Sequence, residues 1–234
     1  MSGSGLRHTL ELMSSESSLI FDLPAVTVRR ISVSEMSNNV YLLTAKKSGV
    51  QVLIDAADDA EAISAMISEA TEDTPCSPGV RAILTTHQHW DHVRALPELA
   101  ASTGAELAAG TDDADAIEAE KSVTIDRRLQ HAETVQYDGI ALDVIQLRGH
   151  TPGSVALVYP VEDGPTHIFT GDSLFPGGVG KTWSSEDFSS LIDDVESRLF
   201  ADYDDDTIIH PGHGAPTTLG DERPHLAAWR ERGW

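Results

Sequence analysis

The sequence predicts an α/β fold, built as a four-layer αββα sandwich, from the order and pattern of its segments. Segments rich in β-branched and aromatic residues alternate with amphipathic helical patterns, and the second half of the chain repeats the rhythm of the first. Each half therefore predicts a mostly antiparallel sheet with helices. Two such sheets, packed face to face under outer helices, make four layers.

The elements of the first half follow from local patterns. Strands are expected at 26–33, 40–44, 50–56, 80–86 and 105–109. The turn "KKSG" at 46–49 joins the second and third of these strands. Helices are expected at 58–70 and within 91–103, and residues 112–121 predict a polar helix or a loop.

The second half predicts strands at 140–147, 155–161 and 167–172, and a strand followed by a glycine-rich loop at 206–214. Residues 184–200 predict an amphipathic helix that begins with Ser184 or Ser185 as its N-cap. The expected apolar face of this helix consists of Phe188, Leu191, Ile192, Val195 and Leu199.

Length and composition predict one domain over residues 25–234, preceded by a flexible, Ser- and Gly-rich N-terminal segment at residues 1–24. No apolar run approaches the roughly 20 residues of a membrane-spanning helix. The N-terminus also lacks the apolar region of a secretory signal. Cys76 is the only cysteine, which excludes an intramolecular disulfide. We therefore expect a cytoplasmic protein.

The charge balance restricts the partners. The chain has 38 acidic and 16 basic residues, a formal net charge of −22. Binding to nucleic acid depends on many phosphate contacts from Lys and Arg, and docking on anionic lipid also needs basic residues. We therefore expect a small-molecule substrate, no nucleic acid and no membrane. The sequence does not indicate an oligomeric state.

Three of the 10 histidines lie within six positions, in "HQHWDH" at residues 87–92. Successive strand residues point to opposite faces, so His87 and His89 can point the same way. Asp91 and His92 then fall where the chain turns into a helix. Imidazoles and carboxylates need partners once buried. Two nitrogen ligands beside an oxygen–nitrogen pair therefore predict half of a dinuclear metal site.

Three other strand ends carry a histidine or an aspartate next to a glycine, which lets the backbone approach closely. They are His150 in "RGHTPGS", Asp172 in "HIFTGD" and His213 in "IIHPGHG". These residues predict the remaining ligands. Imidazoles and carboxylates without thiolates fit Zn²⁺, Fe or Mn²⁺. The histidines expected outside the set are His8, His131, His167, His210 and His225, with His210 in a structural or supporting role.

The motifs "THQHWDH", "GHTPGS", "TGDSLF" and "HPGHG" resemble, in this order and at typical spacing, those of the metallo-β-lactamase superfamily, from about residue 26 to 220. The resemblance implies the αββα metallo-β-lactamase sandwich and two divalent metal ions, zinc first, with iron or manganese as alternatives. It implies one ion held by His87, His89 and His150, a second held by Asp91, His92 and His213, and Asp172 as the bridge.

Within the superfamily, His92 and the stretches "GHTPGSVALV" and "TGDSLFPGGVGKT" look like glyoxalase II-like hydrolases, in a short form without the C-terminal glutathione-binding helical domain. The implied activity is hydrolysis of a small thioester or ester, of the hydroxyacyl-thiol kind. Two close cations lower the pKa of a shared water toward ~7, and Asp91 is the expected catalytic residue that orients it. Lys181 matches the family's basic contact to a substrate carboxylate, so it is the expected substrate-binding residue.

Other activities remain open on the same ligand set. A persulfide dioxygenase, which uses one iron, keeps all seven ligands, and a lactonase is a further hydrolase. A nuclease of the same superfamily is disfavoured by the charge of −22. A non-catalytic binding module is disfavoured because none of the seven ligands is missing.

Overall fold

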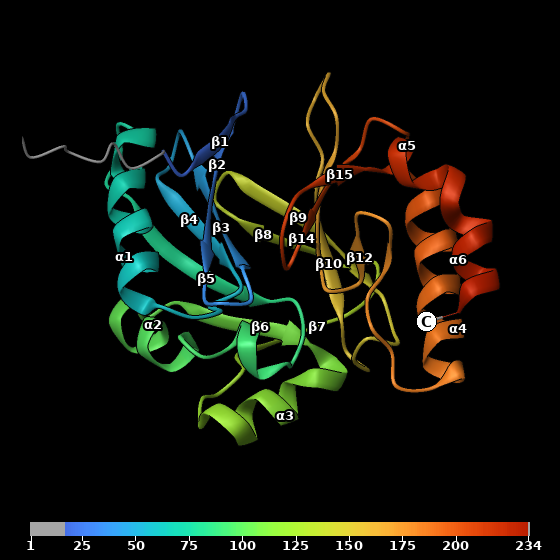
Figure 1. The fold of residues 1–234 in the computed structure, drawn as a ribbon. Helices are drawn as coiled ribbons and strands as arrows, with labels where there is room; N and C mark the ends of the chain where they lie inside the picture. The colour runs from blue at the N-terminus through green and yellow to red at the C-terminus, as the bar shows by residue number, and fades with distance from the viewer. Residues whose placement is uncertain (1–16, 234) are drawn as a thin grey trace, which may run out of the picture.

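The computed structural model describes residues 17–233, which form two sheets with helices on both outer faces (Figure 1). The seven-stranded sheet has the order β1 (Leu19–Asp22), β2 (Val26–Val33), β3 (Asn38–Ala45), β4 (Val50–Ile54), β5 (Gly79–Thr85), β6 (Glu106–Gly110) and β7 (Arg127–Leu129). The six-stranded sheet has the order β15 (Thr217–Thr218), β14 (Ile208–Pro211), β11 (His167–Gly171), β10 (Val155–Tyr159), β9 (Ile140–Gln146) and β8 (Thr134–Tyr137). A small hairpin joins β12 (Leu174–Phe175) to β13 (Gly178–Val179).

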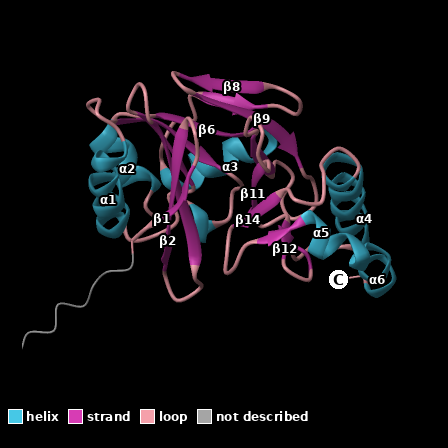
Figure 2. Cartoon of the chain, turned by 90° about the horizontal axis from the view of Figure 1, so that it is seen from above, coloured by secondary structure: helices cyan, strands magenta, loops and turns pink. Residues whose placement is uncertain are grey.

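Most of the helices lie on opposite sides of the pair of sheets, as the view from above shows, whereas α3 (Thr111–Lys121) overlaps the sheets in that view (Figure 2). The first sheet carries α1 (Ala60–Glu69), α2 (Leu96–Thr103) and α3 (Thr111–Lys121). The second sheet is covered by α4 (Ser185–Val195), which continues as a π-helical turn at Glu196–Phe200, and by α5 (Leu219–Glu222) and α6 (Leu226–Arg232). Within residues 17–233, no helix has the length and apolar character needed to cross a membrane.

Three separate apolar layers hold the four structural layers together. In β3, Leu42 packs under the helices of the first sheet, whereas Tyr41 and Leu43 face the space between the sheets. This alternation is the period-two pattern of a strand that is buried on both faces. The third layer joins the second sheet to α4, where Leu191 and Ile192 are fully buried. The αββα sandwich predicted from the sequence is therefore confirmed.

The first sheet differs from the expectation of a mostly antiparallel sheet. Its strands β4, β5, β6 and β7 pair in parallel. Parallel neighbours need a crossover connection of a dozen or more residues, usually with a helix. The helices α1, α2 and α3 lie in these three connections. The patterns located the helices correctly, but the direction of strand pairing depends on how the connections pass over the sheet.

The expected N-terminal segment, residues 1–24, is only partly described, because residues 1–16 lie outside the described residues. The structure places edge strand β1 within this segment, antiparallel to β2. Arg29 of β2 donates from Nη1 to the hydroxyl of Ser18 at 2.9 Å, next to this strand. Short β1, β7 and β8 and the C-terminal helices were not expected, since they have few residues in which a period can appear.

Helix caps follow the sequence closely. Ser184 is the N-cap of α4, and its hydroxyl accepts a hydrogen bond from the backbone N–H of Asp187. The Asp59 carboxylate accepts from the N–H of Ala62 at the start of α1. Each side chain satisfies one of the free N–H groups at a helix start.

Two histidines are part of the core rather than of any donor cluster. His167 on β11 and His210 on β14 are buried, with His167 Nδ1 and His210 Nε2 3.0 Å apart. Aromatic rings surround them: the Phe21 ring lies 4.6 Å from His167, and the Phe169 ring lies 4.8 Å from His210. Burial lowers the pKa of His167 to about 4. Burial, and then the neighbouring His167, lowers the pKa of His210 as well.

This pair makes the stability of the fold sensitive to acid. An unfolded histidine takes up a proton near pH 6.5, whereas the buried pair does so only at lower pH. The free energy of unfolding should therefore fall as the pH drops from about 6.5 toward 4, by about 1.4 kcal/mol per pH unit for each such histidine. Urea unfolding of the metal-free protein between pH 7.5 and 4.5 measures this slope. The double variant His167→Gln/His210→Gln should show a shallower slope, whereas His225→Gln, on the surface, should keep that of the wild type. A double variant with the wild-type slope would contradict this role.

Candidate metal centre

Four strand ends bring the predicted ligands to one edge of the sandwich. After β5 ends at Thr85, the chain places His87 and His89, and a short 3-10 turn over residues 90–92 adds Asp91 and His92. The other ligands follow β9, β11 and β14 and are His150, Asp172 and His213. Strand ends that meet at one edge are a common position for sites in layered α/β folds.

The structure brings all seven of these residues together. Three groups each have ligand atoms within 4.8 Å of one another. The groups are His87–His89–His150, His87–His92–Asp172 and Asp91–His92–His213. Asp172 lies between the first and last of them, because its Oδ2 is 3.6 Å from His150 Nε2 and 3.3 Å from His213 Nε2.

The donor atoms lack protein partners where they face one another. His87 Nε2, His150 Nε2 and Asp172 Oδ1 are buried without a hydrogen-bond partner. The opposite nitrogens are engaged, since His87 Nδ1 lies 3.0 Å from Thr86 Oγ1 and His150 Nδ1 lies 2.7 Å from the carbonyl oxygen of Lys181. Orphaned polar atoms are costly in a folded protein, and a metal-binding histidine characteristically uses its second nitrogen in this way. The donor set therefore fits a divalent metal.

Asp55 supports the cluster through its contacts with His92 and Thr86. The sequence analysis did not identify this residue. Its side chain is buried, and its Oδ2 lies 2.9 Å from His92 Nδ1 and accepts a hydrogen bond from Thr86 Oγ1 at 2.8 Å. The same carboxylate accepts from the Thr86 N–H through Oδ1 at 2.8 Å. The sequence analysis placed Asp55 inside the strand expected at 50–56, whereas β4 ends at Ile54, so Asp55 follows a strand end as the ligands do.

The start of β3 supports the group of Asp91, His92 and His213. Asn38 is buried, and its Nδ2 donates to Asp91 Oδ2 at 2.9 Å. The carbonyl oxygen of Met36 lies 2.9 Å from His213 Nδ1. These two contacts leave His213 Nε2 directed at Asp91 and Asp172, both at 3.3 Å.

Glycine is required where the backbone passes the cluster. A Cβ on Gly212 would lie 2.2 Å from Asp172 Oδ1 and 2.7 Å from His92 Cε1. A Cβ on Gly180 would lie 1.8 Å from the Asp172 carbonyl oxygen. The loops can pass this close to the donor atoms only without side chains.

Electrostatics divide the cluster into two parts. Burial lowers the pKa of His87, His89 and His150, so these rings are neutral, the form that binds metal. Burial would also lower the pKa of His213, but the carboxylates of Asp172 and Asp91 raise it to about 10. Burial opposes ionisation of Asp172, yet the neighbouring His213 and His92 side chains hold its pKa well below the usual value. This part of the cluster therefore presents anionic oxygen.

The predicted substrate residue Lys181 lies on the loop that adjoins the cluster. Its carbonyl oxygen meets His150, and its side chain is exposed, with Nζ 4.5 Å from the centre of the Trp183 ring. Two cavities of about 360 and 420 Å³ flank this loop, and both are lined by Arg232. The first is also lined by Phe175, whose ring lies 6.4 Å from that of His213.

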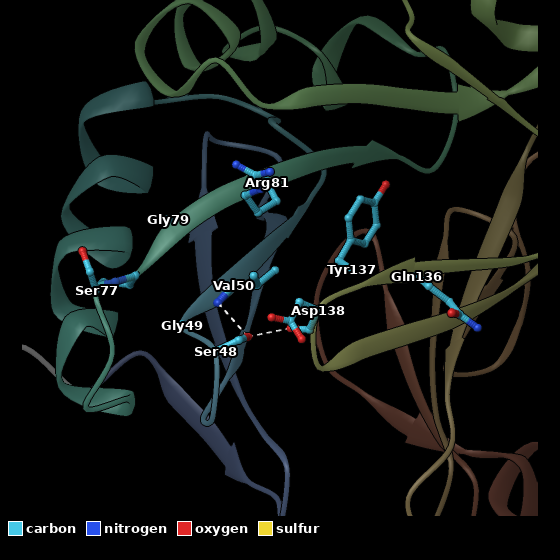
Figure 3. Close-up of a pocket in the computed structure, with 10 residues that line it drawn as sticks. Ser48, Gly49, Val50, Ser77, Gly79, Arg81, Gln136, Tyr137 and Asp138 are labelled. Carbon is cyan, nitrogen blue, oxygen red and sulfur yellow. Dashed lines mark hydrogen bonds between the residues drawn. The ribbon is translucent and has the colours of Figure 1, made fainter.

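Another cavity lies away from the cluster. It has a volume of about 530 Å³ and is lined by the turn after β3, the start of β5 and the β8–β9 hairpin (Figure 3). Arg81 and Tyr137 line it, and Ser48 donates to the carbonyl oxygen of Asp138 at 2.6 Å. None of the seven clustered residues lines this cavity.

The remaining histidines stay apart from the cluster in the described part of the chain. His131 and His225 are exposed, and His167 and His210 form the buried pair described above. His8 lies outside the described residues. The groups of clustered donor atoms contain none of these histidines.

Comparison with known proteins places this geometry in a family. Residues 33–213 match the family model of the metallo-beta-lactamase superfamily. The hydroxyacylglutathione hydrolase GloC of Haemophilus influenzae is 28% identical over 214 residues, covering 85% of this chain and 95% of that protein. A hydroxyacylglutathione hydrolase of Fuscovulum blasticum is 32% identical over 179 residues, covering 75% of this chain and 62% of that protein.

A solved structure agrees with this relationship. TTHA1623, in a di-iron-bound form, is 29% identical, with a TM-score of 0.62, and covers 83% of this chain and 96% of that one. Relatives named as hydrolases, together with the clustered imidazoles and carboxylates, support a metal-dependent hydrolase. The family model matches most of the chain and confirms the resemblance carried by the motifs. The chain therefore belongs to the metallo-beta-lactamase superfamily.

Proposed function

We propose that this protein hydrolyses a small thioester or ester, of the hydroxyacyl-thiol kind, at a site that holds two divalent metal ions. The observation that carries the proposal is the convergence of buried, unpartnered donor atoms from His87, His150 and Asp172. Relatives named hydroxyacylglutathione hydrolase support the thioester class. The di-iron form of a related structure supports two ions and makes iron an alternative to zinc.

The seven clustered residues would form two groups of three metal ligands and one bridging ligand. The neutral rings of His87, His89 and His150 would hold one ion, and Asp91, His92 and His213 would hold the other. Asp172 lies within 4 Å of both groups and would bridge them. A divalent ion held there supplies polarisation of a carbonyl oxygen and a more acidic water as nucleophile.

Asp91 is the residue that we assign to orienting the attacking water. Burial opposes its ionisation, but hydrogen bonds from His213 and Asn38 hold its pKa well below the usual value. Asp91 is therefore a carboxylate across the range in which the enzyme would work, and it accepts hydrogen bonds. Within hydrogen-bond reach of the water, such an acceptor fixes the direction of attack.

The loop over residues 175–183 would select the substrate. Lys181 offers an exposed ammonium group on this loop, and a carboxylate on the thiol part of the substrate would pair with it. The cavity lined by Phe175 and Arg232 offers a second cation and an apolar wall, and the Phe175 ring of that wall lies 6.4 Å from the ring of His213. A thioester of an anionic small thiol matches both features.

The first prediction from the proposed function concerns the ligand His89. His89→Ala should lower kcat/KM for a hydroxyacyl thioester by more than about 100-fold, since it removes a ligand rather than a supporting contact. Metal analysis should show fewer ions per chain, while circular dichroism stays unchanged. His225→Ala, at an exposed histidine outside the cluster, is the control. Wild-type turnover in His89→Ala would show that the ligands are misassigned.

The second prediction concerns metal removal and tests the reaction class. Protein stripped with a chelator should lose thioester hydrolysis, and added Zn²⁺ should restore it, because the proposed nucleophile is a water whose pKa the bound ions would lower. The same preparations are to be tested for oxygen uptake on a persulfide and for hydrolysis of a lactone. Iron-dependent oxygen uptake without thioester hydrolysis would show that the protein is a dioxygenase and not a hydrolase.

The third prediction concerns Lys181. Lys181→Met should raise KM about 10-fold for thioesters whose thiol bears a carboxylate, with little change in kcat, because a contact made equally in the ground state and the transition state affects binding and not the chemical step. The KM for an uncharged thiol ester should not change. Lys47→Met, at an exposed lysine on another turn, serves as the control. An equal loss on both substrates would remove Lys181 from the substrate contact.

A further inference from the structure

Asp113 is a buried carboxylate that lies outside the ligand set. It occupies the first turn of α3, and its side chain has no exposed surface. A buried carboxylate must have hydrogen-bond partners to offset its lost hydration. Its partners therefore indicate its role.

All three partners of Asp113 belong to loops that carry ligands. Its Oδ2 accepts from the backbone N–H of Gln88 at 2.9 Å and from Thr151 Oγ1 at 2.6 Å. Its Oδ1 accepts from the backbone N–H of Gly153 at 2.7 Å. Gln88 stands between His87 and His89, and Thr151 directly follows His150. One carboxylate thus connects the two loops that supply His87, His89 and His150.

Close backbone packing makes this connection rigid. A Cβ on Gly110, just before α3, would lie 1.9 Å from the Gly153 carbonyl oxygen. A Cβ on Gly153 would lie 2.4 Å from the Asp113 nitrogen. The Val155 N–H also donates to the Thr86 carbonyl oxygen at 2.9 Å, which joins the same two loops from the other side. The loops therefore have little freedom to move relative to α3.

The other group of ligands has different supports. His92 is held by Asp55, Asp91 by Asn38, and His213 by the carbonyl oxygen of Met36. The hydrogen bonds of Asp113 reach none of these supports. Asp55 reaches both groups, because it contacts His92 and also accepts from Thr86, whose hydroxyl lies 3.0 Å from His87 Nδ1. The hydrogen bonds of Asp113, in contrast, go only to the loops that carry His87, His89 and His150.

We infer that Asp113 is a positioning residue that sets the spacing of His87, His89 and His150 and thereby controls the metal affinity of that group alone. The inference rests on the proposed function, because it assumes that the group binds a metal. Asp113 contacts neither substrate nor metal, and it acts through the loops.

Asp113→Asn is the sharpest variant, since it keeps the size of the side chain. Two of the three partners are backbone N–H groups, one on each oxygen. An amide must turn its NH₂ toward one of them, so one loop loses its acceptor whichever way the amide faces. Asp115→Asn, on the exposed side of the same helix, is the matched control. Thr151→Val removes the hydroxyl contact to Asp113, together with the contact of that hydroxyl to Ser154 Oγ at 2.6 Å, and gives a milder second variant.

Competition with a chromophoric chelator, using Zn²⁺ on full-length protein, would measure the two dissociation constants. Asp113→Asn should raise one Zn²⁺ dissociation constant about 10- to 100-fold, the usual effect of losing a supporting contact to a metal ligand. The other Zn²⁺ dissociation constant should stay within about 3-fold of the wild-type value. Thr151→Val should raise the same dissociation constant by a smaller factor, and both constants of Asp115→Asn should match those of the wild type. With Co²⁺, the absorption spectrum of only one site should change. The melting temperature of the metal-free variants separates positioning from a general loss of fold.

The outcomes distinguish this inference from the proposed function. A wild type with two Zn²⁺ ions and an Asp113→Asn variant with unchanged constants would overturn the positioning role alone. Equal weakening of both ions would also overturn it, since the effect would not be specific to one group. If Asp113→Asn fails to fold, an unchanged Thr151→Val overturns it in the same way. A wild type that binds no divalent metal would overturn the proposed function itself.

Discussion

The crowding of like donor atoms is the constraint on which this structure depends. His92 Nε2 and His213 Nε2 lie 3.1 Å apart, and Asp172 has a buried oxygen with no hydrogen-bond partner. Atoms of this kind repel one another or remain unsatisfied unless a cation lies among them. Such an arrangement persists only because the surrounding residues bind the ring nitrogens that face away from the cluster. Asp55, the Met36 carbonyl and the Lys181 carbonyl supply these contacts.

Different parts of the fold position the metal ligands and select the substrate. Strand ends and buried polar groups fix the ligands, and three apolar layers hold those strands. The loop over residues 175–183, in contrast, carries Lys181 and borders two cavities at the surface. Chemistry common to the superfamily and the choice of substrate therefore lie on different elements, as is usual when function is placed on a shared fold. Changes to the exposed side chains of the loop would alter specificity without disturbing the ligands only if Gly180 and the Lys181 carbonyl keep their contacts with Asp172 and His150.

Sequence reasoning located the fold class and the seven clustered residues because both leave local signals. The run from His87 to His92 is dense enough to stand out, and His150 and His213 sit beside glycines at strand ends. Asp55 and Asp113 left weaker signals, because their partners come from segments distant in the chain. Parallel pairing of β4 to β7 was missed for the same reason, since strand direction is set by tertiary packing. Short β8 offered too few residues for a period to appear.

A crystal structure of protein purified with its native metal, with anomalous data collected above and below the absorption edge, tests the central claim most directly. The account predicts two anomalous peaks. One should contact His87, His89 and His150, the other should contact Asp91, His92 and His213, and Asp172 should touch both. Fully occupied crystals with no peak among these side chains, or with the ions bound elsewhere on the chain, would contradict it.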